Sequence, residues 1–447
     1  MSGGGLKFRR TIDAVNLAVV FGILLVGTHV APGLRGAASM LSSLGLLLLG
    51  GTLLAKLLEP LRVPHLTGYL VAGLLAGPHA LHLIGEVTVR QLAPVNTLAL
   101  ALIALAGGAE LRIDQLRRGL VSLLVATGLQ NLFVLAGLVL VFVLARDLVP
   151  FTQGLPLASV VAIALLWAVI ATTRSPSATL AVLSQTHARG PLTSFSLAFI
   201  MLSDVVGIVL VAMAITVARA LLDPSGGFSL EPFRALGHEM LGSVAIGTSL
   251  GLLLAAYIRL VGGQLLVVLV ALGFGATEVL HYLHFEPLLT FLVAGFVVQN
   301  LSRQGDRFLH AIEGTGAVVY VVFFAIAGVE LDIPLLRELW ALALLLAAAR
   351  FAMTYLAGRA SSALARDPPI LRRWGWAALV AQAGLTQGLA ALVEREFPSF
   401  GAPFRALAYA NVALNAIVGP IVFKLALDRA GESHAAPALT EGEEASA

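Results

Sequence analysis

The sequence predicts an all-α polytopic membrane protein with two inverted six-helix repeats and broken helices that cross in each half. Three observations predict this fold class: the composition, the spacing of apolar segments and an internal repeat. Of the 447 residues, 58% are hydrophobic and only 12% are charged, whereas about a quarter of an ordinary soluble domain is charged. Apolar runs of about 20 residues recur along the chain, each long enough as a helix to cross a hydrocarbon layer of about 30 Å.

Fourteen apolar segments are the candidate helices, so we expect 13 or 14 transmembrane helices. They lie near residues 14–30, 40–58, 64–84, 93–110, 119–145, 157–184, 193–220, 237–258, 264–283, 287–301, 312–329, 339–363, 374–393 and 404–427. Most arginines between segments fall on the side of the N-terminus, which predicts that both termini are cytoplasmic. We expect the membrane to be a bacterial inner (plasma) membrane. The first segment could instead be a signal peptide, because basic residues precede it and small residues follow.

Three blocks of sequence recur in the same order in the two halves. They are residues 63–78 and 285–300, the segments ending at Ile113 and Ile333, and the LARD motifs ending at Asp147 and Asp367. Segments two to seven therefore recur as segments nine to fourteen, and seven crossings separate corresponding helices. An odd number of crossings reverses direction, so the repeat is inverted. Inverted repeats are typical of secondary transporters, whose sites lie where interrupted helices from the two halves meet.

This repeat divides the chain into five parts. They are an N-terminal helix (1–35), a first repeat (36–222), a linker helix (223–261), a second repeat (262–428) and a disordered cytoplasmic tail (429–447). The tail is polar and rich in Ala, Glu and Ser, a composition typical of disorder. Because no soluble nucleotide-binding domain follows the apolar region, we expect any regulatory soluble subunit to be another chain.

Polar residues interrupt two segments that occupy equivalent places in the repeats. Residues 157–184 contain Thr172, Thr173, Arg174, Ser175, Pro176 and Ser177, and residues 374–393 contain Gln382, Gly384, Thr386, Gln387 and Gly388. Proline removes a helix hydrogen bond, and in lipid the freed carbonyls must line a polar cavity. We therefore expect two broken helices facing each other. The alternative is a proline kink with polar side chains packed between helices.

Three charged residues inside apolar segments are candidate site residues: Asp204, Arg350 and Arg174. Asp204 lies near the middle of residues 193–220, where a carboxylate costs several kcal/mol and marks a functional site by default. We expect a proton and a metal cation to compete for it; a permanent internal salt bridge is the alternative. Arg350 and Arg174 stay charged at any accessible pH, so each needs a carboxylate or carbonyl partner. Gln130, Asn131, Asn411 and Asn415 are further candidates for cavity lining, although such side chains also join helices by hydrogen bonds.

From about Leu41 to Leu427 the chain resembles the monovalent cation:proton antiporter superfamily. The stretch SPSATLAVLSQTHARGPLTSFSLAFIMLSDVVGIVLVAM is similar to the broken helix, turn and ion-binding helix of its second branch, the Kef-type potassium efflux proteins and bacterial sodium:proton exchangers. The resemblance implies that Asp204 binds the cation, Na⁺ or K⁺, and the proton. It places Ser203 where relatives carry Asp, Asn or Gln, Thr173 and Ser175 in the unwound crossing, and Arg350 on a helix that often carries a basic residue.

Two departures from the family pattern bear on mechanism. Ser203 leaves one carboxylate instead of two, which in this family resembles electroneutral exchange. Arg174 places a positive charge where some relatives have an acidic residue. The resemblance also implies a homodimer and an elevator-type motion.

The leading hypothesis is thus a secondary active antiporter that exchanges Na⁺ or K⁺ for H⁺ and needs no cofactor. Two alternatives use the same scaffold: a gated K⁺ efflux channel, or a transporter of anions or other solutes. The chain has no cysteine, and no zinc-ligand cluster or paired-carboxylate motif suggests an enzyme. We expect no binding to nucleic acid, because the net charge of +3 is better explained by membrane orientation.

Overall fold

The computed structural model describes residues 19, 37–61, 63–113, 119–222, 231–262, 264–283, 285–302, 305–331, 333–382 and 384–433. Among these residues every regular element is a helix and no strand occurs. Six of the described helices are long and apolar enough, by length and composition, to cross a membrane. The predicted all-α polytopic architecture is therefore confirmed. Apart from Val19, the predicted segment 14–30 lies outside the described residues, as do residues 434–447 of the predicted tail.

The helices of the N-terminal half are α2 (Ala37–Leu58), α3 (His65–Ala76), α4 (Glu86–Glu110), α6 (Leu120–Leu144), α7 (Leu157–Ile170), α8 (Pro176–Thr186) and α9 (Pro191–Leu222). The connecting helix is α10 (Glu231–Leu260). The C-terminal half contains α11 (Leu265–Tyr282), α12 (Pro287–Leu301), α13 (Gly305–Val329), α14 (Ile333–Leu364), α15 (Pro369–Trp374), α16 (Gly384–Glu396) and α17 (Gly401–Ala430). Short 3₁₀ turns are η1 (Glu59–Leu61), η2 (Arg146–Leu148), η3 (Pro150–Thr152) and η4 (Ala377–Leu379).

These bounds differ from the sequence prediction at the C-terminal end. The disordered tail was expected to start at residue 429, but α17 continues to Ala430 and Glu432 is only 3% exposed. Gly431 ends the helix in the left-handed conformation, with φ of +72°, which glycine adopts without strain. A polar composition did not reveal that Glu432 has hydrogen-bonding partners elsewhere in the protein.

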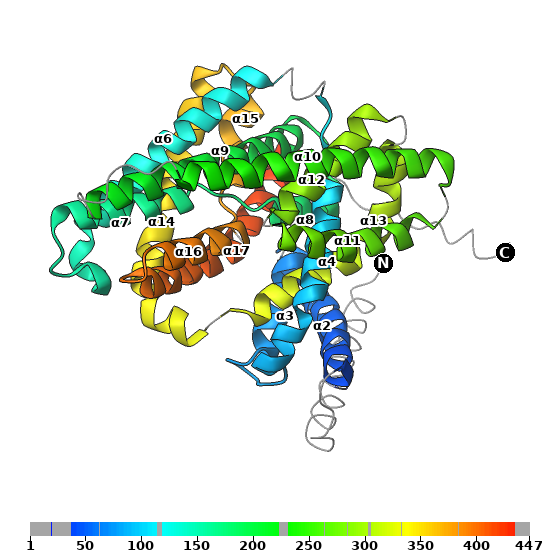
Figure 1. Ribbon diagram of the computed structural model, residues 1–447, viewed down its shortest axis with the longest axis horizontal. Coiled ribbons are helices and arrows are strands. Elements are labelled where there is room, and N and C mark those ends of the chain that lie inside the picture. The colour runs from blue at the N-terminus through cyan, green and yellow to red at the C-terminus, as the bar shows by residue number, and fades with distance from the viewer. Residues whose placement is uncertain are drawn as a thin grey trace.

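The helices form two groups (Figure 1). The first helix group is α2, α3, α4, α10, α11, α12 and α13, and the second helix group is α6, α7, α8, α9, α14, α15, α16 and α17. Each group draws helices from both halves of the chain. A shared apolar cluster lies between them, with Leu66 and Phe323 from the first group and Leu180 and Phe199 from the second. The groups are thus separate packing units in contact along one boundary.

The first helix group contains close contacts that recur in the two halves. In each of four pairs, a methyl group added to a glycine would overlap a backbone carbonyl oxygen of the neighbouring helix. The pairs are Gly73 with Ala325, Gly295 with Leu105, Gly108 with Leu292, and Gly328 with Leu70. Small residues permit such close helix packing in lipid, where no hydrophobic effect drives helices together. Equivalent positions of the repeated blocks make equivalent contacts, which is consistent with the predicted inverted repeat.

Candidate ion-binding site

The first predicted break separates α7 from α8. The α7 helix ends at Ile170, the backbone of 171–175 is not helical, and α8 begins at Pro176. Ser175 caps α8, because its Oγ accepts a hydrogen bond from Ala178 N at 3.1 Å. Pro176 occupies the first helical position, where a missing N–H has no consequence. Local sequence therefore starts a new helix here instead of continuing the old one.

The second predicted break separates η4 from α16, and the two breaks lie side by side. Ser175 N donates a hydrogen bond to Ala381 O at 3.1 Å. The hydroxyl oxygens of Thr173 and Thr386 lie 2.6 Å apart. Each break thus supplies hydrogen-bonding partners for the other. The two interrupted helices cross at this place, within the second helix group.

Arg350 of α14 binds both sides of this crossing. Its side chain is buried, and it donates hydrogen bonds to Ala171 O at 2.8 Å and Thr173 O at 3.1 Å after α7. It also donates to Leu379 O at 3.3 Å, in the last residue of η4, and to Val380 O at 2.6 Å, directly after it. The last carbonyls of a helix lack partners within the helix and carry partial negative charge. One guanidinium therefore satisfies the ends of two broken helices and offsets their charge.

Arg174 serves the α7 end in a similar way. Its buried guanidinium donates to Ala171 O at 3.2 Å, to Thr173 O at 3.1 Å and, through a very short contact, to Thr172 O. Nη2 also donates to Gln130 Oε1 at 3.5 Å, and Gln130 Nε2 donates to Thr354 O of α14 at 3.0 Å. The role of Arg174, left open by the sequence, includes compensation of the α7 terminus.

A chain of amide side chains supports the other face of the crossing. Gln382 Nε2 donates to Ile170 O at 3.4 Å, and Asn415 Nδ2 donates to Gln382 Oε1 at 2.9 Å. Asn415 also donates to Asn411 Oδ1 at 2.8 Å, and Asn411 donates to Ala343 O at 3.1 Å. Three predicted lining residues therefore fix α17 against the crossing.

Two other predicted residues make only local hydrogen bonds. The Thr172 hydroxyl donates to Val169 O at 2.7 Å, and Asn131 donates to Thr127 O at 2.8 Å, each within or next to its own helix. Neither of these side-chain hydrogen bonds reaches the opposite break.

The α9 helix passes the crossing near Ser203 and Asp204. Ser203 is 3% exposed. Gly207 lies one turn further on, where an added Cβ would stand 3.8 Å from Thr173 Cγ2. The Asp204 backbone is part of α9, but its side chain lies outside the described residues. Its role as the cation and proton ligand therefore stays a prediction.

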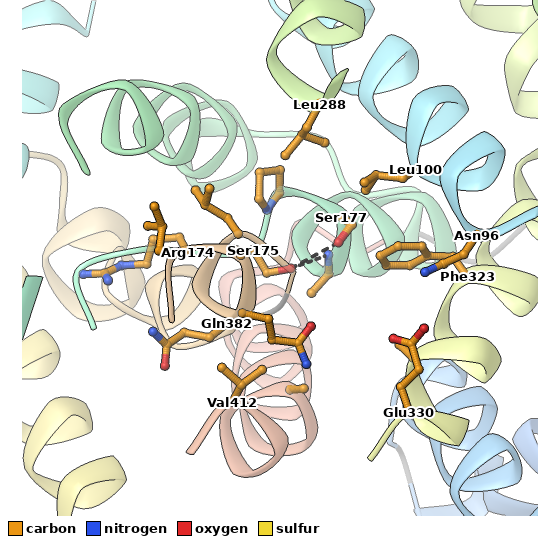
Figure 2. Close-up of a pocket in the computed structure, with 18 of the residues that line it drawn as sticks. Asn96, Leu100, Arg174, Ser175, Ser177, Leu288, Phe323, Glu330, Gln382 and Val412 are labelled. Atoms are coloured by element: carbon orange, nitrogen blue, oxygen red, sulfur yellow. Dashed lines mark hydrogen bonds between the residues drawn. The ribbon is translucent and has the colours of Figure 1, made fainter. Parts of the chain in front are cut away.

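A cavity of about 440 Å³ leads from the crossing along the boundary between the helix groups. Its inner wall includes Arg174, Ser175, Ser177, Gln382 and Gln387 of the second group. The first group contributes Asn96, Leu100, Glu286, Leu288, Phe323 and Glu330, several of which are drawn in Figure 2. Glu330 lines this cavity directly after the end of α13.

The sequence did not single out Asn96 or Glu286 as cavity residues. Glu286 lies in the connection before α12, where burial raises the pKa of its carboxyl to about 7, against the lowering effect of backbone N–H groups. Its charge therefore changes near neutral pH. A Glu-Pro pair at the start of an apolar run could have indicated a helix cap, but not a place on the cavity wall.

Comparison with known proteins bears on this arrangement. The model of the family described as sodium/hydrogen exchanger, transmembrane, matches residues 44–427. The chain belongs to the sodium/hydrogen exchanger family. This membership confirms the predicted cation:proton antiporter superfamily and a multi-pass membrane protein. Among curated proteins, no sequence matches this chain.

The fold is similar to that of a solved structure. That structure is the sodium proton antiporter MjNhaP1 from Methanocaldococcus jannaschii at pH 8. The two chains are 18% identical, with a TM-score of 0.62 over 88% of this chain and 99% of the other. At this identity the likeness establishes a shared fold.

The contacts of Arg350 lead to a stability prediction. Arg350→Lys should lower the free energy of unfolding by about 3 kcal/mol or more, because an ammonium cannot reach both helix ends and leaves buried carbonyls unpaired. Thermal unfolding of the detergent-solubilised protein measures this effect. The control is Arg359→Lys, since Arg359 is exposed and, within the described part of the chain, donates a hydrogen bond to Arg372 O alone, at 2.9 Å. Equal midpoints for the two variants would contradict the bridging role.

Proposed function

We propose that the chain exchanges a monovalent cation, Na⁺ or K⁺, for H⁺ across the membrane. One observation carries this proposal: two broken helices, fixed by Arg350, meet beside the turn of α9 that contains Asp204, at the inner end of a cavity. Membership of the sodium/hydrogen exchanger family supports it. MjNhaP1, which has a similar fold, is itself described as a sodium proton antiporter.

The exchange chemistry needs a group that holds either a proton or a cation. Arg350 and Arg174 keep their charge at any accessible pH and bond to carbonyls, so they cannot carry the proton. Asp204 is the proposed carrier, with oxygen atoms of Ser203, Thr173 and Ser175 as further ligands. A single carboxylate at Asp204, preceded by Ser203, favours one cation for one proton, which makes the exchange electroneutral.

We further propose an elevator-type motion of the second helix group against the first. The cavity lies between the groups and extends toward helix ends at Glu286, Glu330 and Arg395. The opposite face is held by a contact between groups, in which His65 N at the start of α3 donates to Gln185 Oε1 near the end of α8 at 2.7 Å. Alternating access requires this contact to open.

The assembly and orientation follow from the same proposal. We propose a homodimer formed through the first helix group, in an inner membrane, with both termini cytoplasmic. The face of His65 and Gln185 would then be the cytoplasmic one, and the cavity would open outward.

The channel and anion-transport alternatives depended on Arg174 and on the missing second carboxylate. Arg174 donates hydrogen bonds to three backbone carbonyls and to Gln130. Its positive charge therefore offsets the partial negative charge at the end of α7. No feature of the described residues favours either alternative over exchange.

Exchange is tested by proton flux across the membrane of proteoliposomes that contain a pH-sensitive dye. External Na⁺ or K⁺, but not choline, should make the lumen alkaline, because cations enter as protons leave. Asp204→Asn should abolish this response, since an amide cannot release the proton. Asp147→Asn is the matched control, because Asp147 is 86% exposed and far along the chain from α9. No response to any cation, or an undiminished response in Asp204→Asn, would remove the antiporter proposal.

The motion is tested by a crosslink, which the cysteine-free chain makes possible. His65→Cys with Gln185→Cys, joined by a short bis-thiol reagent, should stop exchange until the link is reduced. The control pair is Ser122→Cys with Asp367→Cys. Ser122 Oγ and Asp367 Oδ2 lie 3.0 Å apart within the second helix group, so a crosslink between these positions should leave exchange intact. Full exchange by the crosslinked first pair would contradict the elevator proposal.

A further inference from the structure

The end of the described chain is fastened to the start of α9. After α17 ends, Glu432 turns back into the protein and is 3% exposed. Its Oε1 accepts a hydrogen bond from Leu192 N at 2.7 Å, and its Oε2 accepts from Thr193 N and Thr193 Oγ1, both at 2.8 Å. Glu432 O also accepts from Arg189 N at 3.1 Å. We call this set of four hydrogen bonds the Glu432 clamp.

The chemistry of the clamp is that of a helix cap supplied from far along the sequence. Leu192 and Thr193 are the second and third residues of α9, whose N–H groups have no partner within the helix. Pro191, the first residue, has no N–H to satisfy. A carboxylate at this end is also favoured by the helix dipole. Gly190 leaves room for it, because a Cβ there would overlap the Glu432 side chain.

The clamp connects two helices that both reach the crossing. The α17 helix reaches it through Asn415 and Gln382, and α9 reaches it where Gly207 approaches Thr173. Leu192 of the clamp and Leu427, which is close in sequence to Glu432, belong to the same buried apolar cluster. With α17 fixed at the crossing and again at its end, the position of α9 along its own axis is set relative to the crossing.

We propose that Glu432 is a positioning residue that sets the distance between the Asp204 turn of α9 and the two broken helices. The inference rests on the proposed function, because it concerns the same cation site. A surface cap would stabilise α9 alone. Glu432 instead joins α9 to α17, the helix whose Asn415 donates a hydrogen bond to Gln382 at the crossing. Its loss therefore changes the geometry of the cation site as well as stability.

The test compares Glu432→Ala with a matched control at the same helix end. Asp428→Ala removes an acidic residue whose partner, Lys424 at 2.8 Å, lies on the same helix. Initial exchange rates are measured in proteoliposomes against cation concentration, per mole of folded protein. Glu432→Ala should raise KM for the cation about threefold or more, with the maximal rate within about twofold of wild type. Asp428→Ala should change neither value.

Thr193→Val provides a second, milder variant, because it removes only the hydroxyl that donates to Glu432 Oε2 and keeps both backbone N–H donors. It should raise KM by less than Glu432→Ala does. In the double variant the two effects should not add, since both remove the same interaction. If Glu432→Ala does not fold, Thr193→Val and Glu432→Gln carry the test.

The outcomes separate the two proposals. An unchanged KM in the folded variants, with only fewer folded molecules, makes the clamp merely structural and overturns the inference. If wild type exchanges a cation and Glu432→Ala matches it, only the clamp proposal fails. If wild type exchanges no cation, the proposed function fails, and the clamp proposal fails with it.

Discussion

The structure depends on the hydrogen bonds from Arg350 to the ends of two broken helices. A helix that stops inside an apolar layer leaves carbonyl oxygens without partners, at a cost of several kcal/mol each. In this chain two such ends lie together, and one guanidinium donates to both, with Arg174 adding bonds to the first. Without these donors, the buried carbonyl oxygens at both breaks would lack partners. The buried positive charge of Arg350 therefore stabilises the crossing that Ser175 and Pro176 begin.

The positive charge at the crossing is fixed, because a guanidinium stays protonated throughout the accessible pH range. In the proposed mechanism the crossing keeps its geometry while Asp204 gains or loses a proton. The crossing belongs to the second helix group, whereas the first helix group supplies the facing part of the cavity wall. A site carried by one packing unit and covered by another has the geometry that alternating access requires.

Local patterns were enough to predict the helices and the breaks. Pro176, with Ser175 before it, marks a helix start in any context, and the order of repeated blocks located the equivalent break near Gly384. The charge of Arg350 required a buried partner, and the sequence named carbonyls of a broken helix as one of two possibilities. Hydrogen bonds to those carbonyls join residues 179 and 30 positions apart, so only the folded chain could decide. Asp204 stays a prediction.

Other features had no local signal. Asn96 and Glu286 line the cavity because the first helix group packs against the second, a contact that no single segment encodes. Glu432 lies in a polar stretch with the composition of a disordered tail, and its partners are about 240 residues away. The sequence around Glu432 therefore gives no sign that its carboxylate caps the N-terminus of α9. Sequence patterns thus located the broken helices, while the connections that position them came from tertiary structure.

Proton release on cation binding tests the central claim most directly. The purified protein in detergent, in weak buffer with an indicator dye, is titrated with NaCl or KCl at constant ionic strength set by choline chloride. The account predicts about one proton released for each cation bound, with the release falling as the pH rises and Asp204 is already deprotonated. Asp204→Asn should release none. Cation binding without proton release in the wild type, or equal release in Asp204→Asn, would contradict competition for a single carboxylate beside the crossing.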